Sequence, residues 1–414
     1  MQTSLAPFIK DTPEGREADA ILRKCTHCGM CTATCPTYQL LSDELDGPRG
    51  RIYLIKQVLE GATPTAKTQL HLDRCLTCRA CETTCPTGVR YGRLVDIGRD
   101  LMEARVARGP LESAWRGALN AVIPSSSLFG PLLKMGQLAR PLLPSALKRK
   151  VPPATAPAGP WPSPAHARRM LVLEGCVQPS LSPATNAAAA RVLDRLEISL
   201  VRAAGAGCCG GVSFHLNRQE KALDTMRRTI DAWWTHIEQG AEAIVITASG
   251  CGVTVKEYGH YLQHDPAYAT KAQRVSELTK DISEIITDGW LRLREAGGGR
   301  REAEKQRIAF HPPCTLQHGL KITGKVESIL TDLGFELAPV PDAHLCCGSA
   351  GTYSILQPEL SQRLLSNKIG ALVSGQPQAI LTANIGCQAH LQTATNLPVR
   401  HWIEAVDDSL PYRD

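Results

Sequence analysis

Eight cysteines in the N-terminal quarter of the chain fall into two short runs with identical spacing. Each run reads Cys-x2-Cys-x2-Cys-x3-Cys-Pro, and the runs span residues 25–36 and 75–86. This is the spacing with which bacterial ferredoxins bind two [4Fe–4S] clusters. The first three thiolates of a run can wrap one face of a cluster, whereas the fourth lies too far along and is turned away by proline. We therefore predict that each fourth cysteine binds the cluster of the other run.

This prediction assigns four ligands to each cluster. The first set is Cys25, Cys28, Cys31 and Cys85, and the second is Cys75, Cys78, Cys81 and Cys35. Structural zinc is the alternative, because paired Cys-x2-Cys also suits a tetrahedral Zn²⁺ site. Zinc has no use for a third cysteine at the same short spacing in both runs, so the pattern favours iron–sulfur clusters.

The other eight cysteines form two copies of a second pattern. In each copy a single cysteine is followed 32 residues later by Cys-Cys-Gly, and another cysteine lies 42 or 40 residues beyond the pair. The first copy contains Cys176, Cys208, Cys209 and Cys251, and the second contains Cys314, Cys346, Cys347 and Cys387. Apolar stretches alternate with helical patterns around them, which predicts a duplicated parallel α/β unit, here called a CCG unit. Because functional groups gather at the carboxyl ends of parallel strands, each copy is expected to collect its four thiols in one place.

Three interpretations of the CCG cysteines stay open. They are a further iron–sulfur cluster in one or both copies, a redox-active thiol pair, and structural zinc. Glycines flank each Cys-Cys pair and let the backbone approach closely, which suits a bulky inorganic group better than one metal ion. Among the nearby histidines, His311 lies three residues before Cys314 and is the best candidate for an extra ligand or a proton carrier.

The helices and strands predicted around these cysteines indicate an α+β multidomain protein. The chain has 414 residues, of which 43% are hydrophobic and 21% charged, as in ordinary globular proteins of two or three domains. Helical spacing between and after the two runs predicts an α-helical ferredoxin domain. The predicted boundaries are 1–108 for this domain, 109–167 for a connector, and 168–300 and 301–414 for the two CCG units.

The connector carries more than the whole positive excess of the chain. The net charge is +6, yet residues 101–170 contain ten basic and two acidic residues, a local net charge of +8. Residues 151–164 are rich in proline and alanine and predict a stiff linker. Residues 121–150 suit either docking to an anionic membrane or a partner subunit, or two short packed helices with a solvated basic face. Prolines are expected to prevent one long amphipathic helix.

The sequence lacks the motifs that indicate several other functions and locations. There is no basic-then-apolar signal peptide at the N-terminus and no run of 18 apolar residues. No glycine-rich dinucleotide fingerprint follows the first strand of either CCG unit, and no Ser/His/Asp arrangement stands out. We therefore expect no catalytic residue in this chain and a substrate-oxidising cofactor on another subunit. Metal-bound thiolates suit a reducing cytoplasm, and no nucleic acid is expected among the partners.

The doubled ferredoxin run followed by two CCG units resembles a known family of electron carriers. That family contains glycolate oxidase iron–sulfur subunits, an iron–sulfur subunit of anaerobic glycerol-3-phosphate dehydrogenase, a lactate-utilisation iron–sulfur protein and heterodisulfide reductase subunits. The stretches most similar to the glycolate oxidase branch are 35–61, 185–196, 247–252, 311–319 and 344–353. The resemblance implies a peripheral complex on the cytoplasmic face of the inner membrane. There, flavin-containing subunits would oxidise glycolate to glyoxylate and this subunit would pass electrons toward quinone.

One departure from the family bears on the CCG cysteines. Members with heterodisulfide reductase activity carry a final Cys-x2-Cys in each unit, whereas no second cysteine follows Cys251 or Cys387 here. A four-thiolate site, with His390 as an additional candidate ligand, fits this sequence better than a five-thiolate one. The alternative functions are an iron–sulfur subunit for glycerol-3-phosphate or lactate oxidation, and a thiol–disulfide reductase acting at the CCG cysteines.

Overall fold

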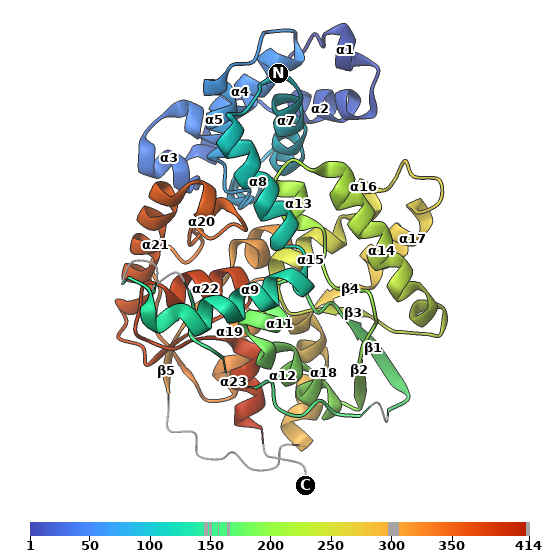
Figure 1. Cartoon of the computed structure of the whole chain (residues 1–414), viewed down its shortest axis with the longest axis vertical. Helices are drawn as coiled ribbons and strands as arrows, with labels where there is room; N and C mark the ends of the chain where they lie inside the picture. Colours follow the sequence, from blue (N-terminus) through green and yellow to red (C-terminus); the bar gives the residue numbers. More distant parts are fainter. Residues whose placement is uncertain (145–147, 149–150, 156, 164–165, 297–305, 411–414) are drawn as a thin grey trace. The chain divides into compact units, whose positions relative to one another are not determined.

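The computed structural model describes residues 1–144, 148, 151–155, 157–163, 166–296 and 306–410 (Figure 1). The chain forms two compact units. The first comprises Met1–Gly117, His215–Asn217 and His344–Lys368, and the second comprises Ala118–Phe214, Arg218–Ala343 and Ile369–Asp414.

The N-terminal part of the first unit is helical, which confirms the helical character predicted for residues 1–108. Its helices are α1 (Pro7–Lys10), α2 (Pro13–Lys24), α3 (Pro36–Leu41), α4 (Pro48–Leu59), α5 (Ala66–Asp73), α6 (Ala80–Thr84) and α7 (Tyr91–Arg105). Prolines start α2, α3 and α4, where a missing N–H costs nothing. Helices α2, α4, α5 and α7 enclose an apolar core that includes Leu22, Ile55 and Leu94 (Figure 1). The cysteine runs connect these helices, so the core fixes where each run begins and ends.

The second unit contains two four-stranded parallel sheets with the same topology. The first sheet has the order β2-β1-β3-β4 and the second β6-β5-β7-β8. The strands of the first are β1 (Arg168–Val172), β2 (Ile198–Arg202), β3 (Ile244–Ile246) and β4 (Thr279–Asp281). Those of the second are β5 (Arg307–His311), β6 (Glu336–Leu337), β7 (Ala379–Thr382) and β8 (Val399–His401). This repetition confirms the predicted duplication of a parallel α/β unit.

The remaining described helices precede, connect or follow these strands. Within the second unit they are α9 (Ser126–Ala139), α11 (Gln178–Leu181), α12 (Pro183–Asp194), α14 (Gln219–Glu238), α15 (Ser249–Lys256), α16 (Tyr258–Tyr261), α17 (Ala269–Leu278), α18 (Ile282–Ala296), α19 (Lys325–Asp332), α22 (Ile385–Gln392) and α23 (Trp402–Ser409). Helix α20 (Tyr353–Leu356) belongs to the first unit, and α8 (Pro110–Val122), α13 (Gly211–His215) and α21 (Pro358–Val373) contribute residues to both. Among the helices described, none combines the length and apolarity that a bilayer crossing requires.

The two sheets share one apolar core, and polar contacts join their helices. Val172 and Val245 from the first sheet and Ile308 and Leu381 from the second belong to the same buried cluster. Between α12 and α23, the guanidinium of Arg191 binds the Asp407 carboxylate at 2.6 Å, and the Thr185 hydroxyl donates to Glu404 at 2.6 Å. The two copies are therefore packed as one body rather than strung out as separate domains.

The apolar stretches before Cys251 and Cys387 predict strands that reach these cysteines, and this prediction was wrong. The strands β3 and β7 stop earlier, at Ile246 and Thr382, and both cysteines lie in the first turn of the following helix, α15 or α22. The expectation that prolines prevent one long amphipathic helix over residues 121–150 is confirmed. Helix α8 ends at Val122 and α9 spans only Ser126–Ala139, although α9 continues through Pro131.

A buried ion pair ties the two cysteine runs together in the first unit. Arg51 on α4 is 1% exposed and Asp46 is 0% exposed, and their side chains lie 3.4 Å apart. Arg51 also donates to the carbonyl oxygen of His71 at 2.7 Å and to the Thr37 hydroxyl at 3.2 Å. Arg74 completes the network with a 2.8 Å bond to the other Asp46 oxygen. The guanidinium thus bridges the chain after the first run to the helix before the second.

We predict that Arg51→Gln is strongly destabilising, because it leaves the Asp46 carboxylate buried and only partly compensated. The free energy of unfolding should fall by ~3 kcal/mol, the order seen when one partner of a buried pair is removed. Urea unfolding of the iron-loaded protein and its iron content after gel filtration would measure the effect.

Lys56→Gln is the matched control, since Lys56 lies on the same helix as Arg51 but pairs with Glu60 in partly exposed surroundings, where the two side chains are 18% and 25% exposed. Its effect should stay below about 1 kcal/mol. Equal losses in the two variants would contradict a special role for the buried guanidinium.

Candidate iron–sulfur sites

The two cysteine runs adopt the same unusual backbone conformation. In the first run His27 and Gly29 have φ of 60° and 84°, and in the second the equivalent Thr77 and Arg79 have φ of 52° and 60°. Non-glycine residues rarely adopt positive φ, and for a β-branched threonine it is strained. Such a conformation at matched positions turns successive N–H groups to the inside of each loop, as in other anion-binding backbone nests. The loops are therefore shaped to surround a negatively charged group.

The equivalent ends of the two runs meet each other. The hydroxyl of Thr84 donates to that of Thr34 at 3.1 Å, and these threonines occupy the same position in the two runs. Each precedes the fourth cysteine of its run, so this contact brings the two Cys-Pro segments together although they lie 50 residues apart in sequence.

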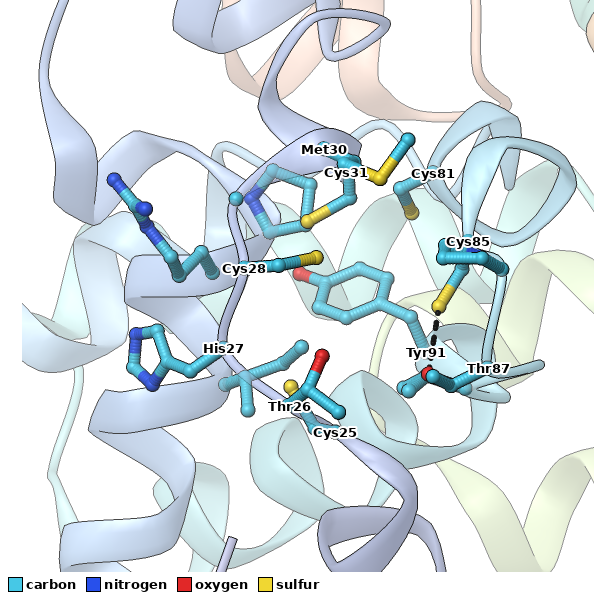
Figure 2. A pocket seen from close by; sticks show the side chains of 16 residues that line it. Cys25, Thr26, His27, Cys28, Met30, Cys31, Cys81, Cys85, Thr87 and Tyr91 are labelled. Atoms are coloured by element: carbon cyan, nitrogen blue, oxygen red, sulfur yellow. Dashed lines mark hydrogen bonds between the residues drawn. The ribbon is translucent and has the colours of Figure 1, made fainter.

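A cavity in the first unit is lined by three cysteines of the first run and the fourth of the second. Figure 2 shows Cys28 and Cys31 directing their sulfur atoms toward its centre in front of the Tyr91 ring, with Cys25 below them and Cys85 on the opposite side. Cys81 also lines this cavity. The other lining groups near the thiols include Pro48, Arg49, Ile52, Pro86 and Val89.

A second cavity beside it has the reciprocal composition. Its cysteines are Cys75, Cys78 and Cys81 of the second run together with Cys35 of the first. Arg51 and Tyr91 line it too, and the Tyr91 hydroxyl lies 3.7 Å from the Cys75 sulfur, to which it donates. Cys81 and Tyr91 border both cavities, so the two sites share a wall.

Hydroxyl groups contact the fourth cysteine of each run. Thr37 Oγ1 lies 3.3 Å from Cys35 Sγ, and Thr87 Oγ1 lies 3.3 Å from Cys85 Sγ (Figure 2). Both threonines follow in a repeated Cys-Pro-Thr triplet. They were not among the predicted site residues, although the repeated triplet was a usable signal. The Thr87 hydroxyl can rotate to donate to the Cys85 thiolate. The Thr37 hydroxyl instead donates to the Asp46 carbonyl at 2.8 Å, and so links the first run to the buried ion pair.

The pKa values of cysteine thiols in these two cavities shift in opposite directions at exposed and buried positions. The backbone N–H of Met30 is the main cause that lowers the pKa of the exposed Cys28. By contrast, burial raises the pKa of Cys31 to about 11 and that of Cys81 well above its ordinary value. Buried thiols that resist ionisation lose their protons when iron binds. Four converging thiols, N–H donors and a shielded cavity fit an iron–sulfur cluster, which suits the donor set better than a lone cation.

The four thiols of the first CCG copy come together in the second unit. Hydrogen bonds from the Cys176 and Cys209 thiols lower the pKa of Cys208, and Cys209 is in turn linked to Cys251. The backbone N–H groups of Gly210 and Gly211 lie 3.4 Å from the sulfurs of Cys208 and Cys209, respectively. The Tyr258 hydroxyl donates to the Cys209 carbonyl at 2.9 Å and thereby fixes this loop.

The cysteines of the second copy are buried but belong to different compact units. Cys346 and Cys347 lie in the first unit, where the N–H of Gly348 points at Cys346 Sγ from 3.5 Å. Cys314 and Cys387 lie in the second unit, where the Asn384 amide donates to Cys387 Sγ at 3.7 Å. His311 and His390, the candidate additional ligands, are also buried there, 1% and 8% exposed.

Comparison with known protein families assigns the two cysteine patterns to two different families. The family described as "4Fe-4S dicluster domain" matches residues 21–89, and the family described as "Cysteine-rich domain" matches residues 170–256 and 308–392. The cofactors of the N-terminal part are therefore two [4Fe–4S] clusters.

Two curated relatives cover more than nine tenths of the chain, and a third covers about half. The glycolate oxidase iron–sulfur subunit of Escherichia coli is 57% identical over 410 residues, which is 99% of either chain. The probable glycolate oxidase iron–sulfur subunit of Bacillus subtilis is 28% identical over 92% of this chain and 90% of its own. Lactate utilization protein A of Bacillus licheniformis is 26% identical over 48% of this chain and 80% of its own. The chain accordingly belongs to the family of glycolate oxidase iron–sulfur subunits.

Proposed function

We propose that this protein relays electrons within a glycolate oxidase complex at the cytoplasmic face of the inner membrane. Flavin-containing partner subunits oxidise glycolate to glyoxylate, and the electrons pass through this chain toward quinone. The two adjoining cysteine cavities carry the proposal, because Cys81 borders both and the path between them is short. When bound, the clusters supply one-electron transfer. The chain's own residues hold them, exclude water and supply N–H and hydroxyl donors to the sulfurs.

We further propose that Cys25, Cys28, Cys31 and Cys85 bind one cluster, and that Cys75, Cys78, Cys81 and Cys35 bind the other. The composition of the two cavities supports this exchange of fourth ligands. The exposure of Cys28 makes the first cavity the more accessible to a partner, whereas Cys35, Cys75 and Cys81 in the second are each 7% exposed.

Single serine variants test this exchange of fourth ligands. The EPR signal altered by replacing each fourth cysteine is compared with the signals altered by replacing Cys28 in the first run and Cys78 in the second. If the assignment holds, Cys85→Ser should alter the same EPR signal as Cys28→Ser, and Cys35→Ser the same signal as Cys78→Ser. Potentiometric EPR of the purified, iron-loaded chain would compare the four variants. A match of Cys85→Ser with Cys78→Ser would instead place all four ligands of a cluster in one run.

The proposed electron relay leads to a separate prediction. The isolated iron-loaded chain should show reducible [4Fe–4S] EPR signals but should not oxidise glycolate, because it supplies no hydride-accepting cofactor. Adding the flavin-containing subunits should make these signals appear on addition of glycolate. Glycolate oxidation by the chain alone would contradict this division of labour, whereas a response to lactate and not glycolate would favour the lactate-linked alternative suggested by the more distant relatives.

The first CCG copy is proposed to hold a further iron–sulfur cluster. Four thiols and two loop N–H groups converge there, and Cys176, Cys208 and Cys209 are 8%, 8% and 6% exposed. Hydrogen bonds from the Cys176 and Cys209 thiols lower the pKa of Cys208, which favours metal binding because ligating sulfurs must lose their protons. This burial disfavours the thiol–disulfide reductase alternative, since a disulfide substrate must reach the attacking sulfur.

Cys209→Ser should remove about four irons per chain relative to the unchanged protein, the content of one [4Fe–4S] cluster. The EPR signals of the N-terminal clusters should persist, which separates cluster loss from misfolding. Iron, sulfide and zinc would be quantified on the same preparations. Equal iron in both proteins, or zinc lost in place of iron, would overturn this third cluster while leaving the relay intact.

A further inference from the structure

Helix α9 presents an exposed apolar stripe. Leu128, Leu132 and Met135 are 50%, 49% and 65% exposed, and Leu138 and Leu142 beyond them are 82% and 89% exposed. Residues spaced by three or four positions share one face of a helix, so most of these side chains form a continuous band. Contiguous apolar surface of this kind marks an interaction site rather than ordinary surface variation.

The opposite face of α9 is anchored to the second unit. At Gly130 an added methyl group would come within 3.1 Å of the Ser180 hydroxyl on α11, so this helix packs closely there. Gln137 donates to the Pro153 carbonyl at 3.2 Å, and Arg140 donates to the Val151 carbonyl at 2.9 Å. The helix is therefore held in a fixed orientation with its apolar band outward.

The charge around the stripe favours an anionic lipid surface over a protein partner. Residues 113–173 contain no aspartate or glutamate, and the exposed Lys134 and Lys148 lie on α9 and shortly after it. Lysine is depleted in protein–protein interfaces, whereas this band of leucines and one methionine is flanked by lysine. An apolar helix face in a segment whose charged residues are all basic is typical of helices that lie in the surface of an anionic bilayer.

We propose that α9 docks this protein on an anionic lipid surface, with the stripe inserted among the acyl chains and the lysines at the headgroups. The inference deepens the proposed membrane location and rests on it. It assigns the contact to one helix of this chain and requires no membrane-spanning segment.

Flotation of the iron-loaded full chain with vesicles tests the proposal. The protein should bind phosphatidylglycerol-containing vesicles much more strongly than pure phosphatidylcholine vesicles, and added salt should weaken binding. The triple variant Leu132→Ser/Met135→Ser/Leu138→Ser should weaken binding at least about tenfold, because it removes the inserted apolar area. Lys134→Gln/Lys148→Gln should weaken binding about fivefold per charge on the anionic vesicles only.

Matched controls distinguish the stripe from general surface effects. Arg274→Gln/Lys280→Gln removes two exposed charges elsewhere, and Ile355→Ser removes an exposed apolar side chain. Neither should change vesicle binding. All variants should keep their iron and their glycolate-dependent reduction with the flavin subunits, so a failure of the relay would be seen separately.

Three results would overturn the proposal. The first is unchanged vesicle binding by the triple variant, and the second is no binding by the unchanged protein. The third is loss of the flavin subunits from the purified complex in the triple variant while vesicle binding persists, which would make the stripe a subunit interface.

Discussion

The ionisation of buried thiols is the constraint on which this structure depends. Cysteine binds iron as thiolate, yet burial opposes that charge and raises the pKa of Cys31 and Cys81. The chain offsets this cost with donors aimed at sulfur. The N–H of Met30 serves Cys28, and that of Gly210 serves Cys208. The left-handed residues of the loops follow from this need, because a regular helix or strand would direct its N–H groups to other backbone atoms.

The same constraint explains why a charged pair lies in an otherwise apolar helical core. A hydrophobic replacement of a buried ion pair is often neutral or stabilising, so Arg51 and Asp46 need another reason to be there. Arg51 offers a fork of donors that reaches the His71 carbonyl and the Thr37 hydroxyl at once. It also places a positive charge within reach of Cys35 and Cys75. One side chain thus joins the two runs and compensates the negative charge that collects between them.

Features that are repeated or periodic in the sequence could be predicted from it, whereas most other features of the structure could not. The doubled cysteine runs, the helical spacers and the duplicated parallel units were all predicted, and the family comparisons and the two sheets agree with them. The strands β4 and β8 were missed because their residues, Thr-Lys-Asp and Val-Arg-His, form no apolar stretch. The Arg51–Asp46 pair and the exposure of the α9 stripe could not be predicted, since both depend on which segments pack together in three dimensions.

Burial also separates electron transfer from thiol chemistry in the CCG units. A disulfide exchange requires in-line contact between an attacking sulfur and its substrate, whereas an electron needs only a nearby donor. Cys208 carries the lowered pKa that would suit a nucleophile, but it is 8% exposed and its thiol partners already surround it. Low pKa without access favours a metal ligand over a catalytic nucleophile. The buried thiols of the first CCG copy therefore support the proposed third cluster more than a thiol–disulfide exchange site.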